Sequence, residues 1–182
     1  MAGATIPKGH VHRSAYTLED QERMSRAENY FAWQSRLVAR ELGRRVVEVG
    51  CGLGNFTGML LRQALHGMAS ILGPGGVIVL LVPAFPALYG PIDSNLGHCR
   101  RYNCGSIARL ADATGLRIRK IHYVNAAGFF GWWVNAHILR RRAQSERQIE
   151  IFDRYLVPLL SRLEGLVSPP FGQSLFVVLE KP

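Results

Sequence analysis

The sequence predicts an α/β fold, a buried sheet flanked by helices. Three observations predict it. The apolar run 46–49 leads into a turn with glycines at alternate positions, Gly50, Gly52 and Gly54, and a helical pattern follows. After that helix comes a continuous aliphatic run, 77–82, which is typical of a strand buried in a parallel sheet. Another strand-like segment closes the chain.

Length and composition set the limits of the interpretation. A chain of 182 residues with 48% hydrophobic and 19% charged residues is long enough for one globular domain, here residues 1–182. Residues 1–15 show no periodicity, and we expect them to form a flexible arm. The formal charge of +9 would suit nucleic acid, anionic lipid or an acidic substrate. We expect no nucleic-acid partner, because the sequence has no long Lys/Arg tract and no helix-turn-helix pattern.

Cysteine usage and hydropathy predict a cytoplasmic protein. Cys51, Cys99 and Cys104 are odd in number and form no C-x-x-C pair, so neither a disulfide scaffold nor a zinc site is predicted. The first 14 residues lack the apolar core of a secretory signal, and no stretch reaches the apolar length of a membrane span. No metal is expected.

The first helical region runs from Thr17 to Leu42. Thr17 is a candidate N-cap, the apolar positions recur at helical spacing, and Gly43 is a candidate stop. We predict two helices with a break near residues 25–28.

The glycine turn predicts a ligand-binding loop. Glycines without a Cβ allow a ligand close to the backbone, and the helix predicted for 56–72 would present its free N–H groups there. Asn55 stands where a dinucleotide fingerprint requires its third glycine, which disfavours a nicotinamide or flavin dinucleotide.

The stretch Glu48-Val49-Gly50-Cys51-Gly52-Leu53-Gly54 resembles the first motif of the class I S-adenosylmethionine (SAM)-dependent methyltransferases. The resemblance implies SAM as cofactor, packed against the turn. It assigns the binding role to five residues: Glu48, Gly50, Cys51, Gly52 and Gly54. Glu48 would orient the methionine moiety, a favourable place for a carboxylate near an ammonium and a sulfonium. The alternative is a purely structural glycine turn.

The resemblance extends upstream. Asn29, Tyr30 and Trp33 form an Asn-Tyr-x-x-Trp pattern that many family members carry before the first strand. These residues would either cover the cofactor or cap the sheet, and the sequence favours neither role.

Downstream, the pattern departs from the family. The helix ends at the breaker 73–76, and the run 77–82 resembles the fifth strand of the family's sheet. Only one helix separates it from the glycine turn, where the family has three further strands, so roughly 60 residues are missing near positions 61–64. No Asp or Glu lies between Glu48 and Asp93, and the acid that would bind the ribose is absent. We therefore predict a reduced Rossmann-like SAM-methyltransferase sheet.

The most distinctive chemistry lies in residues 83–102, which we predict to be a long loop after the strand 77–82. It contains Tyr-Gly-x-x-Asp-x-x-x-Gly-His-x-Arg-Arg-Tyr, which resembles a subgroup of small-molecule and glycolipid-associated methyltransferases. The candidate catalytic residues are Asp93 and His98, either of which could take a proton from a substrate hydroxyl.

The same motif supplies the candidate substrate-binding residues, Tyr89, Arg100, Arg101 and Tyr102. The arginines would hold an acidic substrate group. Each residue also has a structural alternative: Asp93 capping a turn, His98 bonding loop backbone, and the arginines pairing with Asp93 or facing water.

The remaining elements read as a helix at 106–114, a strand at 116–124, a helix at 152–166 broken at Pro158, and a final antiparallel strand at 172–179. Residues 125–134 are rich in aromatics. They would roof a substrate, rest on a membrane surface beside Arg140-Arg141-Arg142, or pack in the core or a dimer, and core or dimer packing is favoured.

The resemblance implies methyl transfer from SAM to a small-molecule or lipid-linked, glycolipid-like acceptor. The competing hypothesis is a non-catalytic remnant of that family, or a protein that acts only with a partner. A peripheral membrane contact and a homo-oligomer both stay open.

Overall fold

A computed structural model of the chain describes residues 25–43, 60–95, 98, 100–141 and 145–182. The flexible arm expected at 1–15, the apolar run 46–49 and the glycine turn with Glu48, Cys51 and Gly54 lie outside the described residues.

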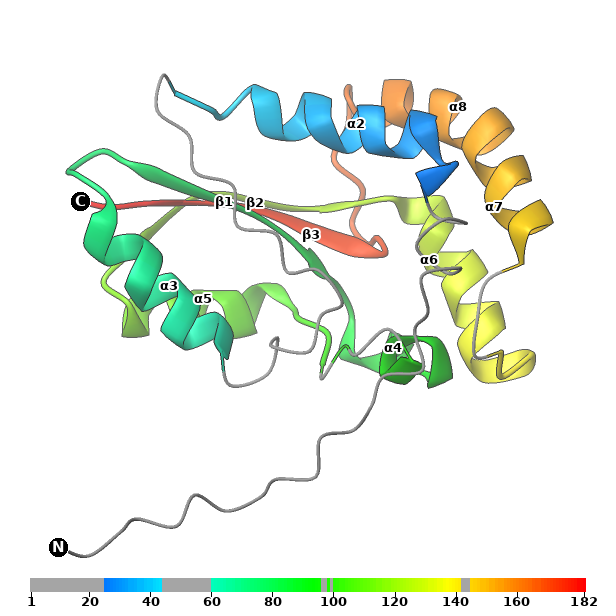
Figure 1. Cartoon of the computed structure of the whole chain (residues 1–182), viewed down its shortest axis with the longest axis horizontal. Coiled ribbons are helices and arrows are strands. Elements are labelled where there is room, and N and C mark those ends of the chain that lie inside the picture. Colours follow the sequence, from blue (N-terminus) through cyan, green and yellow to red (C-terminus); the bar gives the residue numbers. More distant parts are fainter. Residues whose placement is uncertain (1–24, 44–59, 96–97, 99, 142–144) are drawn as a thin grey trace, which may run out of the picture.

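The described sheet has three strands, β1 (Val77–Pro83), β2 (Arg117–Val124) and β3 (Ser174–Glu180), in the order β1-β3-β2. Strand β3 runs antiparallel to both neighbours (Figure 1), and its register with β1 runs from Val77 opposite Glu180 to Pro83 opposite Ser174. The final antiparallel strand predicted from the sequence is confirmed. The sequence predicts that the strand at 77–82 lies in a parallel sheet, but its pairing with β3 is antiparallel. The prediction fails because a continuous aliphatic run suits either strand direction when both faces of the sheet are covered.

Strand β3 is the central strand of the sheet, and its side chains point alternately to the two faces. Leu175, Val177 and Leu179 lie in one hydrophobic cluster, while Phe176 and Val178 lie in another on the opposite face. All five side chains are at most 1% exposed. A strand covered on both faces has to be apolar at every position, which explains its continuous hydrophobic pattern.

Helices α3 (Leu60–Ile71) and α5 (Cys104–Ala113) cover one face of the sheet (Figure 1). Leu65 of α3 and Ile107 of α5 are buried in the cluster with Leu175. Helix α5 begins at a capping box: the Asn103 side chain accepts from the backbone N–H of Ser106, and the Ser106 hydroxyl accepts from the N–H of Asn103. Both helices overlap the predicted ones.

Helix α2 (Glu28–Ala39) covers the other face and confirms the predicted break near 25–28. Two backbone N–H groups at its start, those of Asn29 and Tyr30, donate to the carboxylate of Asp153. Trp33 is 4% exposed, and Leu37 and Val38 pack against the cluster of Phe176 and Val178. Within the Asn-Tyr-x-x-Trp pattern, Asn29 and Tyr30 contact Asp153 and Trp33 is buried, and the two roles weighed for the pattern both stay predictions.

Two helical arms complete the described fold. The first is α6 (Ala126–Trp133) with the π-helical turn η2 (Val134–Ile138). The second is α7 (Glu146–Ile151), the π-helical turn η3 (Phe152–Leu156) and α8 (Val157–Leu163). We call residues 126–167 the helical hairpin.

The two arms of the hairpin are tied at both ends. Glu164 accepts from the backbone N–H groups of Asn125 and Ala126, at 2.8 and 2.9 Å, and thereby satisfies the start of α6. At the other end, Arg141 Nη1 donates to Gln148 Oε1 at 3.3 Å.

The break predicted at Pro158 is wrong. The helical path continues from Glu146 to Leu163, with Pro158 in the first turn of α8. Proline is tolerated there because its missing N–H lies at a helix start, and the wider turn η3 precedes it. The helix also begins six residues before the predicted start, where the Ser145 side chain caps it.

The region predicted as a loop, 83–102, contains two short helical elements: η1 (Pro86–Leu88) and α4 (Pro91–Asn95). Among the helices that the structure describes, none has both the length and the apolar character needed to cross a membrane.

Candidate functional site

The site lies where the chain leaves β1. The segment turns at Phe85, whose φ of +58° is in the left-handed region, and returns beside itself at Tyr102. Two backbone bonds close this excursion, from Phe85 N to Tyr102 O and from Tyr102 N to Pro83 O. The closure places η1, α4 and the described polar residues of the motif together at the end of β1.

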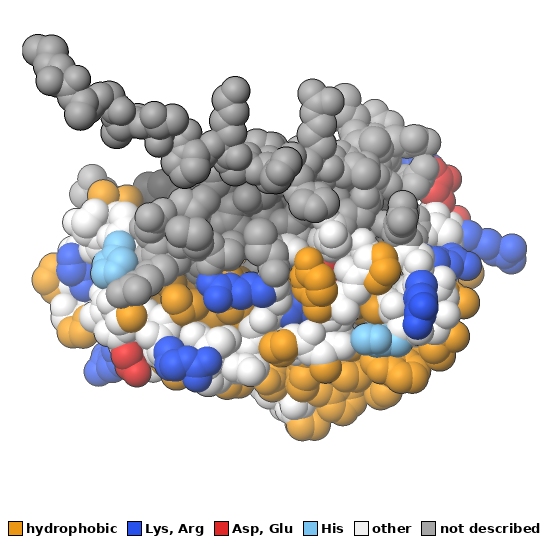
Figure 2. All heavy atoms as spheres, turned by 90° about the horizontal axis from the view of Figure 1, so that it is seen from below, with side chains coloured by type: hydrophobic (Ala, Val, Ile, Leu, Met, Phe, Trp, Pro, Cys, Tyr) orange, Lys and Arg blue, Asp and Glu red, His pale blue; other side chains and the backbone are white. Residues whose placement is uncertain are grey.

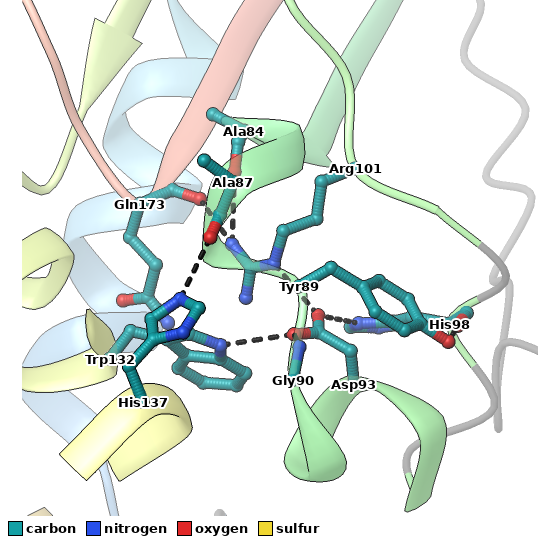
Figure 3. A network of polar contacts seen from close by, with 10 residues as sticks. All are labelled: Ala84, Ala87, Tyr89, Gly90, Asp93, His98, Arg101, Trp132, His137 and Gln173. Carbon is teal, nitrogen blue, oxygen red and sulfur yellow. Dashed lines mark hydrogen bonds and ion pairs between the residues drawn. The ribbon is translucent and has the colours of Figure 1, made fainter. Parts of the chain in front are cut away.

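Asp93 is the centre of a polar network (Figure 3). Its side chain is fully buried and contacts four donors. Oδ1 accepts from Arg101 Nε at 2.9 Å and lies 3.2 Å from His98 Nδ1. Oδ2 accepts from Gly90 N and from Trp132 Nε1, each at 3.1 Å.

These contacts determine the charge state of Asp93. Burial alone raises the pKa of a carboxyl group, but the hydrogen bond from His98 and the positive charge of Arg101 outweigh it, and the pKa of Asp93 lies below its ordinary value. A buried, ionised carboxylate with four donors around it is a poor proton acceptor. The role of Asp93 is to hold the four surrounding donor groups in place.

Asp93 also holds His98, through two hydrogen-bond contacts. Its backbone N–H donates to Asp93 O at 2.8 Å, and its Nδ1 faces the carboxylate. Because an ionised carboxylate only accepts hydrogen bonds, Nδ1 carries the hydrogen, and the lone pair of the neutral ring is on Nε2. The side chain is 25% exposed, so the imidazole is both oriented and reachable. Of the two predicted proton acceptors, this geometry favours His98.

The Arg101 side chain is buried and makes its contacts within the protein. Its side chain is 1% exposed, pairs with Asp93, and donates through Nη1 to the carbonyl oxygen of Ala84 at 3.0 Å. Its guanidinium also stacks on Trp132, 4.7 Å from the ring centroid. Of the roles considered from the sequence, pairing with Asp93 is the one these contacts describe, and binding an acidic substrate would require breaking them.

Of the other three predicted substrate-binding residues, one is buried in the core and two are exposed. Tyr102 is 1% exposed and belongs to the core cluster. Arg100 is exposed and lies over the ring of Tyr102, with Nε donating to its hydroxyl at 3.3 Å. Tyr89 is 40% exposed, and its hydroxyl donates to His98 O at 2.9 Å. Tyr89 is therefore the exposed member that directly adjoins the histidine.

Helix α6 and η2 supply residues of the site that the sequence motifs do not identify. Trp132 reaches Asp93 from 39 positions further along the chain, and His137 Nε2 lies 2.8 Å from Ala87 O. Gly90 packs so tightly on Ala136 that a Cβ added to it would lie 2.6 Å from the Cβ of that alanine. The only sequence signal was the dense run of aromatics, which indicated burial without indicating a partner.

A separate hollow of about 360 Å³ opens at the start of α7, away from Asp93. It is lined by Arg26, Glu146, Ile149, Glu150, Asp153 and Arg154. Asp153 already accepts from the start of α2, and Glu146 pairs with Arg26 at 3.8 Å, so these lining groups are engaged within the fold.

The predicted SAM residues, Glu48, Gly50, Cys51, Gly52 and Gly54, lie outside the described residues. Within the described ranges, no group of three His, Cys, Asp or Glu side chains is placed to hold a metal ion. No protein-family model, curated protein or solved structure matches this chain.

Proposed function

We propose that the chain transfers a methyl group from SAM to a hydroxyl of a small-molecule or glycolipid-like acceptor, with His98 as the general base. The observation that carries the proposal is the Asp93–His98 pair beyond the end of β1, because the carboxylate orients an imidazole whose side chain is 25% exposed.

Two further features support the choice of methyl transfer. The residues from Glu48 to Gly54 and from Tyr89 to Tyr102 both resemble methyltransferase motifs. The final antiparallel strand expected by that resemblance corresponds to β3.

Bound SAM would supply an electrophilic methyl group to the acceptor oxygen, and the electron pair of the broken carbon–sulfur bond would stay on sulfur. Nε2 of His98 takes the hydroxyl proton. Asp93 keeps the imidazole in the required tautomer and stabilises the imidazolium. Arg101 and Trp132 hold Asp93 in place. Tyr89, whose hydroxyl donates to His98 O, borders the position where an acceptor would approach His98.

The second candidate is a methyltransferase-like protein without catalysis of its own. It is favoured by the absence of any Asp or Glu between Glu48 and Asp93, which removes the usual acid for the ribose hydroxyls. Arg101 and Tyr102, which the resemblance assigns to the substrate, are also engaged in the core.

Titration calorimetry with SAM and with its demethylated product distinguishes the two. The first candidate predicts one-to-one binding near micromolar affinity, about 8 kcal/mol. Gly52→Val should abolish that binding because the added side chain fills the turn. Gly67→Ala is the control, since nothing lies within 4 Å of a Cβ added at that exposed helix position.

His98 is tested separately. His98→Gln should retain SAM affinity and lose about 100-fold or more in the rate of methyl transfer to an active acceptor. A folded chain that binds neither SAM nor its product would support the second candidate. An unchanged transfer rate in the His98 variant would remove the base from the mechanism.

A further inference from the structure

The helical hairpin, residues 126–167, carries an unusual share of exposed apolar surface. Fifteen large hydrophobic side chains are exposed in the described parts of the chain, and eleven of them lie on the hairpin. They are Phe130, Trp133, Ile138, Leu139, Ile151, Tyr155, Leu156, Leu159, Leu163, Leu166 and Val167. Single exposed hydrophobics are ordinary, but a concentration of this kind marks a contact surface.

The second arm shows the pattern most clearly. Ile151, Tyr155, Leu159 and Leu163 recur every four residues, and each is between 47% and 65% exposed. This spacing places them along one side of the helical path. The buried side of the arm is formed by Ile149, Asp153 and Val157, which also recur every four residues. The arm therefore packs one side on the protein and presents a second, apolar side to solvent.

The first arm has the same character. Phe130 and Trp133 on α6 are 59% and 45% exposed, and Ile138 and Leu139 at the end of η2 are 60% and 46% exposed. Figure 2 shows hydrophobic side chains gathered into a patch on the side of the molecule where α6 lies in Figure 1. Tryptophan and tyrosine, with an apolar ring and a polar atom, are the side chains preferred at a membrane–water interface.

The charges around this apolar surface are mainly positive. The described hairpin exposes five arginines, at positions 140, 141, 147, 154 and 162, against two exposed acids, Glu146 and Glu150, a balance of 5 − 2 = +3. Its other two acids, Asp153 and Glu164, accept backbone N–H groups. No Asp or Glu occurs anywhere from 113 to 145.

We propose that the helical hairpin docks on an anionic lipid bilayer, with its apolar side chains at the level of the headgroups and its arginines on lipid phosphates. A bilayer surface offers apolar depth and negative charge together. A second copy of this chain would bring another excess of arginines to the same contact, and the like charges would oppose association. The proposal is independent of the methyl transfer proposed above.

Vesicle flotation with the full chain tests the docking. We expect the protein to float with vesicles of phosphatidylcholine containing about one third phosphatidylserine, and to bind vesicles of phosphatidylcholine alone far less. Raising the salt concentration should weaken the binding, because salt screens the arginine–phosphate attraction.

Two pairs of variants separate apolar from electrostatic contributions. The double variant Leu159→Glu/Leu163→Glu should lose flotation, whereas Ile71→Glu, on α3 and 70% exposed, should retain it. Arg147→Gln and Arg162→Gln should each weaken binding by about five-fold, and Arg109→Gln on α5 should leave it unchanged. Circular dichroism checks that each variant keeps the helical content of the parent.

Two results would overturn the proposal. One is flotation that the Leu159/Leu163 double variant leaves intact. The other is absence of binding to anionic vesicles together with a concentration-dependent dimer, measured by sedimentation velocity, that the same double variant dissociates. The second result would identify another copy of the chain as the occupant.

Discussion

Removing the carboxylate of Asp93 should destabilise the protein more than any other single change in the loop between β1 and α5. In Asp93→Ala, Arg101 loses its counter-charge while its side chain stays 1% exposed. Removing one partner of a buried ion pair costs about 3–5 kcal/mol. The N–H groups of Gly90 and Trp132 also lose their acceptor, at about 1–3 kcal/mol each if they stay unsatisfied.

These costs overlap, because all the donors converge on one carboxylate and relax together. We therefore expect a loss of about 4 kcal/mol, a large fraction of the 5–15 kcal/mol that ordinarily stabilises a domain. Urea unfolding followed by tryptophan fluorescence measures it, and Trp132 provides a probe within the network. Ser94→Ala is the matched control: Ser94 is exposed on the same short helix, and its change should stay within about 0.5 kcal/mol.

A second substitution separates the ion pair from general damage to the loop. Adding Arg101→Met to Asp93→Ala removes the uncompensated charge and keeps an apolar chain on Trp132. The double variant should be more stable than Asp93→Ala, with a coupling energy of about 2 kcal/mol or more. The reasoning would be refuted by a loss under about 1 kcal/mol in the single variant, or by two losses that simply add.

Three further outcomes follow from individual contacts. Because the pKa of Asp93 is lowered in the folded state, its contribution to stability is present above the unfolded value of 3.8 and is lost as the pH falls below it. The stability difference between the parent and Asp93→Asn, from urea midpoints, should therefore shrink below about pH 4 and stay constant above about pH 6. Gly172→Ala should cost about 1–3 kcal/mol in urea unfolding, because the added Cβ meets the backbone carbonyl of Val124, and an unchanged midpoint would contradict this. Gly67→Ala, in an exposed helix with open space around it, should instead stabilise by about 0.5–1 kcal/mol in thermal melts, and a lowered melting temperature would count against it.

Much of the described secondary structure follows from local sequence patterns. The breaker 73–76 ends α3, and the aliphatic run after it becomes β1. The closing segment becomes β3, antiparallel as expected. Side-chain periodicity and breaker residues act over a few positions, so such elements can be predicted without knowledge of the tertiary fold.

The errors have a different origin. The region 83–102 was predicted as loop, yet η1 and α4 form in it, both with a proline in the first turn and both packed against the helical hairpin through Leu88 and Ile92. Pro158 predicts a helix break from the sequence, but the π-helical turn before it lets the helix continue. Strand direction in the β1–β3 pair also depends on a partner nearly a hundred positions away. Local patterns contain none of this information.

The candidate site shows the same division. By itself, the sequence placed Asp93, His98 and two arginines within nine positions and so predicted their chemistry. Only the tertiary structure decided their roles, since consecutive residues of an extended segment point to opposite sides, leaving Arg100 exposed and Arg101 buried on the carboxylate. It also brought Trp132 to the same carboxylate from a distant helix. A hydrogen-bond network of this kind forms when separate elements pack, and its membership is a property of the fold.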